Sequence, residues 1–347
     1  MGRLYEQGLS AYDFANLERE LRVSGLIPNA LVPPILPLAP PFLLPLVGLL
    51  AKLDFADALL IFSVSSIGLV ALSLRVLSRL MPSSFQSLYS STGALAVLSF
   101  SPLWKMILIG QVSSVVLLGI SLALLCFINS RWTALGASLA LMLMKPTLCI
   151  GAWATFFSRS GSRVGLVIGV MIASMLLAST LGFQFFPVSA QYLDALKSSL
   201  ETTRSYPQPT INAILPSALR GALDPISSVG LLLLGLCAGA CGTREIVMQR
   251  ILGLILPLSC LFSPYLWAHD LVLLMPSYLC IWLNPKTSRG TRLLMACTNI
   301  LWLSDFLATG REQWALALPL LILWLYWRKQ NRRLSALGCR FSPADFT

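Results

Sequence analysis

The sequence predicts an all-helical membrane protein whose chain crosses the bilayer many times. Of its 347 residues, 56% are hydrophobic and only 11% are charged, whereas about a quarter of the residues of a soluble domain are charged. The mean hydropathy of +0.78 is too high to come from one anchor, because the apolar runs are spread over the whole length. We therefore expect residues 1–347 to form one integral membrane domain, built as a transmembrane helical bundle.

The formal charge of +11 does not indicate a nucleic-acid-binding protein. Lysine and arginine lie in short loops between apolar runs, as the positive-inside rule requires, and no basic patch with interleaved aromatic residues is present. The expected partners are membrane lipids, and no nucleic acid is expected.

The apolar runs give about eleven candidate spans, since about 20 apolar residues cross a bilayer as a helix. Breaks at charged, proline or glycine residues separate the runs, and several are short enough to be tilted or re-entrant. The runs are 39–52, 56–77, 91–104, 110–128, 132–155, 164–185, 226–242, 248–262, 268–283, 292–308 and 313–327.

The basic loops orient these spans. If the long polar loop 186–225 is extracytoplasmic, the basic residues near 159–163, 244–250 and 286–292 and the basic tail 328–347 all lie inside. We therefore expect a multi-pass protein of the plasma (inner) membrane with a cytoplasmic C-terminus. Arg75, Arg79 and Arg131 disagree, because the count places them outside, together with the N-terminus.

Two polar segments have the pattern of helices that lie on the outer membrane face. In the segment 1–38, Asp13 is a candidate N-cap ahead of an apolar stripe that includes Leu17 and Leu21. In the loop 186–225, Tyr192, Leu196 and Leu200 share one helix face. Short solvated loops are the alternative.

Small residues predict close helix packing. Gly161, Gly165 and Gly169, and the pair Gly235 and Gly239, have the small-xxx-small spacing that lets two helices approach closely.

Lys145, followed by Pro146, lies in the middle of the run 132–155. A lysine at the centre of a membrane costs about 3 kcal/mol on insertion scales, and a proline inside a helix frees a backbone carbonyl. Lys145 is therefore a candidate to bind a phosphate or another anion at a helix break. A snorkelling or internally paired lysine is the alternative.

His269 is the only histidine, and it precedes Asp270 near the start of the run 268–283. It could bind phosphate or orient an acceptor hydroxyl, or it could cap the following helix. Gln111 opens the run 110–128 as a polar group that needs a partner, either a substrate or another helix. No zinc-protease, nucleotide-binding or catalytic-triad motif is present, so no metal or cofactor is expected.

An ordered series of short motifs resembles the pattern of the glycosyltransferase 87 family. The series is LYEQGLSAYD (4–13), PP (33–34), GQVS (110–113), MKP (144–146), TINAIL (210–215) and SPYLWAHD (263–270). These enzymes are polytopic and of the GT-C type, and they use polyprenyl-phosphate sugars, typically polyprenyl-phosphomannose.

The resemblance implies an inverting hexosyltransferase that moves a mannose-like sugar from a polyprenyl phosphate to an acceptor hydroxyl on the extracytoplasmic side. Lys145 and His269 match family positions near the donor phosphate, and Gln111 and Asn212 match polar lining. Ser113 replaces an asparagine often found in the family two residues after the glutamine.

The family pattern usually begins with a transmembrane helix and an aspartate, the expected general base, ahead of the stretch that matches residues 4–13. Here Met1 falls after that position, so we expect the base upstream of the printed start; Asp13, Glu18 or Glu20 are the candidates within it. A non-catalytic, shortened paralogue, or a transporter or flippase of a lipid-linked or anionic substrate, are the alternative functions.

Overall fold

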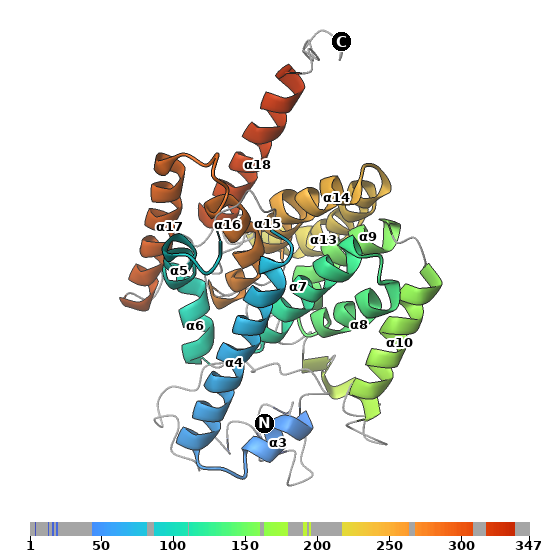
Figure 1. Cartoon of the computed structure of the whole chain (residues 1–347). Coiled ribbons are helices and arrows are strands. Elements are labelled where there is room, and N and C mark those ends of the chain that lie inside the picture. Colours follow the sequence, from blue (N-terminus) through green and yellow to red (C-terminus); the bar gives the residue numbers. More distant parts are fainter. Residues whose placement is uncertain are drawn as a thin grey trace.

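The chain is helical throughout the part that the structure describes, which contains no strand (Figure 1). The structure is a computed structural model and describes residues 4, 13, 16, 19, 44–81, 87–109, 111–159, 163–179, 190–192, 194–195, 217–263, 268–307 and 317–336. The predicted all-helical class is confirmed. Most of the segment 1–38 and of the loop 186–225, including Asn212, lies outside the described residues.

Several of the predicted apolar runs are divided into shorter helices, whereas other helices extend beyond the runs that predicted them. Their bounds are α3 (Leu44–Leu50), α4 (Phe55–Ser78), α5 (Ser91–Leu98), α6 (Ser101–Ile109), α7 (Ser113–Ile128), α8 (Trp132–Met142), α9 (Pro146–Arg159), α10 (Arg163–Ser179), α13 (Ser217–Ala240), α14 (Arg244–Arg250), η3 (Ile251–Ile255), α15 (Leu256–Leu261), η4 (Ala268–Leu274), α16 (Met275–Trp282), α17 (Arg289–Leu307) and α18 (Ala317–Ala336). Helix α13 begins inside the predicted loop 186–225, and α18 continues into the predicted tail.

Among the described residues, one helix, Ala56–Ser78, is long and apolar enough to cross a membrane by itself. The pair Ser91–Leu98 and Ser101–Leu108 adds a second candidate if its 54° bend is counted within one span. The predicted number of spans is therefore not confirmed. Other helices nevertheless carry exposed apolar side chains, such as Val164, Leu233 and Leu293 on α10, α13 and α17.

Helices α7 and α8 form an antiparallel hairpin. Ser130 turns the chain with a positive φ of 58°, and Arg131 N–H donates to Cys126 O at 2.9 Å. Farther along, a Cβ on Gly119 would meet the side chains of Leu141 and Met142 at 3.1 Å. The end of α8 therefore lies beside the first half of α7.

The run 132–155, which we predicted as one span, is two helices. Helix α8 ends at Met142, and α9 begins at Pro146. Proline is tolerated in the first turn of a helix but not in its interior, and it disfavours helical geometry in the residue before it. The MKP sequence therefore separates the two helices, and Lys145 lies at the break.

Helix α9 runs parallel to α13. A Cβ on Gly235 would collide with Gly151 O, and one on Gly239 would collide with Thr155 O, so the contacts advance together along both helices. Gly169 likewise packs on the α8 backbone at Thr133. These contacts confirm the packing role predicted for Gly169, Gly235 and Gly239.

The C-terminal ends of α7, α9 and α13 lie on one face. Arg244 donates to Ile128 O at 3.1 Å and stacks over Trp132 with 5.5 Å to the ring centroid. Arg250 donates to Ala238 O and Cys241 O at 2.8 Å and 2.6 Å. The α8–α9 segment therefore starts and ends on the same face of the bundle, with Lys145 at its inner tip. We call this segment the re-entrant pair.

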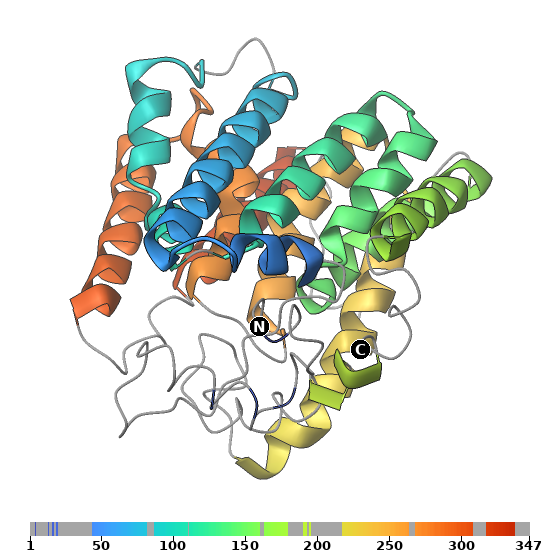
Figure 2. The same cartoon turned by 90° about the horizontal axis from the view of Figure 1, so that it is seen from below.

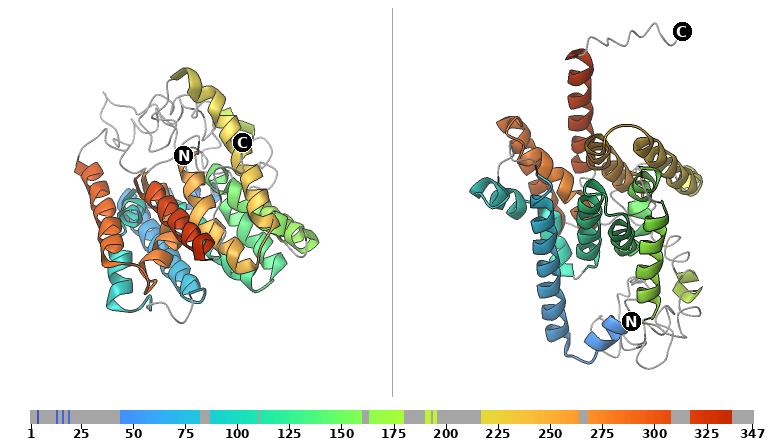
Figure 3. Two further views of the ribbon diagram at one scale, coloured as in Figure 1. Left: turned by 90° about the horizontal axis from the view of Figure 1, so that it is seen from above. Right: turned by 45° about the vertical axis from the view of Figure 1, so that its right-hand side comes forward.

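This arrangement corrects the predicted position of Arg131. Counting 132–155 as one span had placed Arg131 and Arg244 on opposite faces, but Arg244 contacts both neighbours of the 129–131 turn. The C-terminal end of α4, with Arg75, also points toward the end of the bundle that holds α14 and α18 (Figures 1 and 3). We call this end the basic face. Helix α3 and the start of α4 lie at the opposite end (Figure 1), which faces the viewer in Figure 2.

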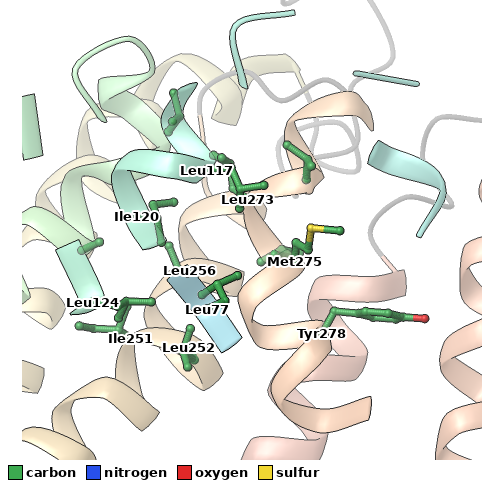
Figure 4. Close-up of a cluster of buried hydrophobic side chains, with 14 of the residues drawn as sticks. Leu77, Leu117, Ile120, Leu124, Ile251, Leu252, Leu256, Leu273, Met275 and Tyr278 are labelled. Atoms are coloured by element: carbon green, nitrogen blue, oxygen red, sulfur yellow. The ribbon is translucent and has the colours of Figure 1, made fainter. Parts of the chain in front are cut away.

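A continuous rod, α14–η3–α15, connects the basic face to the far end. Its π-helical turn gives Leu256 N–H a bond to Ile251 O, while Pro257 has no N–H to offer to Leu252 O. Ser277 donates its hydroxyl to that carbonyl at 2.6 Å. The rod and the returning η4–α16 segment thus pack antiparallel around a buried apolar cluster that includes Leu117, Ile120, Leu252 and Leu273 (Figure 4).

We expect Gly239→Val to destabilise the protein, because the added side chain would collide with the α9 backbone at Thr155. Overpacking of this kind costs about 1–3 kcal/mol and should lower the melting temperature measured in detergent. Gly230→Val is the matched control, since it lies on the same helix with nothing within 4 Å of its Cβ position. Equal melting temperatures for the two variants would contradict the packing.

Labelling of single cysteines in a cysteine-free background should place Arg131→Cys and Lys286→Cys on the same side of the membrane. Lys52→Cys, at the opposite end, should be labelled from the other side by a membrane-impermeant maleimide. All three positions are exposed. If Arg131→Cys were labelled together with Lys52→Cys, the residues 132–155 would cross the membrane once, and the re-entrant pair would be wrong.

Candidate functional site

A buried ion pair joins Lys145 to Asp270. The two residues are 7% and 0% exposed, and the Lys145 ammonium donates to Asp270 Oδ1. Ser113 Oγ donates to the same oxygen at 2.9 Å. Two donors from different parts of the chain therefore converge on one carboxylate oxygen.

The fold explains why these residues meet. The α7–α8 hairpin carries the chain back beside α7, so the break after α8 brings Lys145 near Ser113 at the start of α7. On the other side, the antiparallel packing of η4–α16 against the α14–η3–α15 rod places Asp270 at the start of η4, far from the basic face. Helix α6 and helix α7 both pack against η4.

His269 belongs to the same cluster. It is 6% exposed, and its Nε2 lies 3.5 Å from Asp270 Oδ1, a separation longer than that of an ordinary hydrogen bond. The structure therefore brings Lys145 and His269, two of the residues predicted to bind the phosphate of the sugar donor, together around Asp270.

The other predicted residues are less directly involved. Gln111 is half-buried two residues before Ser113, and its backbone N–H donates to Met106 O at 3.1 Å. Asp13 is exposed and accepts a bond from Asn16 Nδ2 at 3.1 Å. Asn212 lies outside the described residues.

Sequence reasoning missed the roles of Asp270 and Ser113. It treated Asp270 only as the neighbour of His269, and it noted Ser113 only as a departure from the family pattern. The signal was present, because a lysine in an apolar run needs a counter-charge and Asp270 is an acid at the start of another apolar run. The structure shows Lys145 internally paired with Asp270, and its role in binding a phosphate stays a prediction.

The cluster is suited to holding an anion beside a fixed cation. A buried ion pair persists only where its geometry is good and hydrogen bonds satisfy its remaining groups, and Ser113 supplies such a bond to Asp270. An ammonium has three donors, and its bond to Asp270 uses one. Among the described residues, no group of three or more His, Cys, Asp or Glu side chains could hold a metal ion.

We expect Ser113→Ala to destabilise the cluster, since hydrogen bonds to charged groups contribute about 1.5–3 kcal/mol. Ser121→Ala is the matched control: Ser121 is equally buried on the same helix, but its hydroxyl donates to Leu117 O within that helix. The melting temperature of the purified protein should fall more for Ser113→Ala than for Ser121→Ala. The opposite order would show that the bond to Asp270 contributes little.

Comparison with known proteins supports the resemblance and covers the motifs at 110–113, 144–146 and 210–215. The model of glycosyltransferase family 87 matches residues 38–264, which is most of the chain. The match includes Gln111, Ser113, Lys145 and Asn212 and ends just before His269 and Asp270. No curated protein and no solved structure was found to match. The chain therefore belongs to glycosyltransferase family 87, a family of membrane enzymes that transfer sugars.

Proposed function

We propose that this glycosyltransferase moves a mannose-like hexose from a polyprenyl-phosphate donor to an acceptor hydroxyl, with inversion, on the extracytoplasmic side of the plasma membrane. The observation that carries the proposal is the lysine buried at the inner tip of the re-entrant pair, with His269 beside it. Lys145 and His269 would bind the donor phosphate, and Gln111 and Asn212 would line the site.

The chemistry of the reaction supports this assignment. When the bond from the sugar to the phosphate breaks, negative charge builds up on the leaving polyprenyl phosphate. Hydrogen-bond donors and cations that are already in position stabilise such charge best where water is excluded. The ammonium of Lys145 meets this requirement, because it is buried and its position is fixed by Asp270.

The position of the cluster supports transfer on the extracytoplasmic side. Helix α7 has 16 residues, which corresponds to about 24 Å along its axis. Ser113 lies at one end of this helix, and Ile128 at the other end contacts Arg244 on the basic face. Because loops rich in Lys and Arg face the cytoplasm, the site would lie toward the outer leaflet.

The general base is a separate part of the proposal. Asp270 accepts bonds from Lys145 and Ser113, so it serves as a counter-charge and not as the group that deprotonates the acceptor. Asp13 stays the candidate base within the printed sequence.

Reconstituted protein supplied with radiolabelled polyprenyl-phosphomannose and an extract of membrane lipids and glycans should release polyprenyl phosphate and label an acceptor. His269→Ala should lower kcat about 10²-fold or more, as expected for loss of a donor to developing charge. Thr298→Val is the control, since Thr298 is buried on α17 and its hydroxyl donates to Leu294 O.

Two outcomes would contradict the proposal. Unchanged transfer after both His269→Ala and Lys145→Ala would remove the site assignment. Movement of intact donor across the bilayer of a vesicle, without cleavage of the sugar–phosphate bond, would favour the transporter or flippase alternative.

A further inference from the structure

Asp270 is a fully buried acid that the proposed reaction does not use as a base. Its Oδ1 accepts from the Lys145 ammonium and from Ser113 Oγ, and His269 Nε2 lies 3.5 Å from the same atom. One oxygen therefore gathers side chains from the start of α7, the break between α8 and α9, and the start of η4.

Lys145 depends on this oxygen for its position. The residue lies outside both flanking helices, and its backbone is held by turn bonds from Lys145 N–H to Met142 O at 3.1 Å and from Leu148 N–H to Lys145 O at 3.2 Å. These bonds orient the backbone but do not fix the long, flexible side chain, which has many rotamers. The bond to Asp270 is what fixes the ammonium at the tip of the re-entrant pair.

Lys145 also depends on Asp270 for its counter-charge. The pair also interacts electrostatically with Cys149 on α9, Cys260 on α15 and His269, and Lys105 on α6 acts on His269. None of these groups is an acid that is negative at neutral pH in its ordinary state. An isolated ammonium in apolar surroundings is unfavourable and tends to lose its proton.

We propose that Asp270 is a positioning residue for the donor phosphate: it gives the buried Lys145 ammonium its counter-charge and holds it where the phosphate binds. This inference rests on the proposed function, and it deepens it by dividing the cluster into groups that touch the donor and a group that acts through Lys145. In this division His269 and Lys145 contact the phosphate. Asp270 does not contact it but binds Lys145, and Ser113 binds Asp270.

Asp270→Asn tests the charge while preserving the shape, since the amide oxygen can still accept from Lys145 and Ser113. We expect KM for polyprenyl-phosphomannose to rise about tenfold or more, equivalent to about 1.4 kcal/mol, with a smaller change in kcat. The loss should grow from pH 6 to pH 9, because an ammonium without its counter-charge gives up its proton more readily. Asp270→Glu should restore most of the affinity and the pH profile.

Asp54→Asn is the matched control, since Asp54 is exposed at the start of α4 and makes no side-chain capping bond. It should leave KM and its pH dependence unchanged. A KM and a pH profile of Asp270→Asn that match those of the wild type would overturn the positioning role.

A second measurement does not depend on activity. Melting temperatures in nanodiscs should be low for Lys145→Met and for Asp270→Asn, because each variant leaves one buried charge unpaired. Leaving one charge unpaired costs more stability than removing both charges. The double variant should therefore melt higher than at least one single variant, with a clear coupling between the two sites. Independent effects would show that the pair does not form and would overturn the inference.

The two experiments together separate this inference from the proposed function. Coupling in the melting temperatures without any binding of polyprenyl monophosphate or transfer of sugar would refute the proposed function, and the donor role of Asp270 with it. Coupling, transfer and a pH-dependent rise in KM for Asp270→Asn would support both. Coupling and transfer with an unchanged KM would refute only the positioning role.

Discussion

The ion pair between Lys145 and Asp270 is the interaction on which the rest of this structure depends. Breaking such a pair by removing one partner costs about 3–5 kcal/mol, because the remaining charge is buried without compensation. The pair can form only if the α8–α9 segment turns back at Lys145 and if η4 begins beside the start of α7. Neutralising this one cation inside an apolar bundle therefore constrains the relative arrangement of α7, α8, α9 and η4.

The re-entrant pair also explains why the basic residue Arg131 lies on the same face as the other basic turns. When residues 132–155 turn back, Arg131 shares a face with Arg244 and Arg250, which cap the C-terminal ends of α7 and α13. Cations near helix C-termini are favourable because the last carbonyls there lack partners. The basic residues at these turns thus satisfy helix ends within the bundle, and they gather on one face of it.

Close approach of the helices gives the cluster its rigid support. Gly235 and Gly239 let α13 lie against α9, and Gly169 lets α10 lie against α8. Both helices of the re-entrant pair are therefore held from outside by neighbours that a larger residue would push away. The proposed binding of a phosphate by Lys145 requires such support, because a cation misplaced by even about 1 Å contributes much less to a reaction.

The sequence by itself determined the helical class, the membership of a sugar-transferring membrane family, the glycines that pack helices together, and the unusual position of Lys145. The tertiary structure alone decided that the run around Lys145 reverses, which face Arg131 occupies, and that Asp270 is the partner of Lys145. Hydropathy records how apolar each segment of the chain is. It does not record whether the chain continues or reverses at a break of three residues such as that between α8 and α9. An ion pair between residues so far apart in sequence depends on how whole helices pack, and no local pattern encodes that packing.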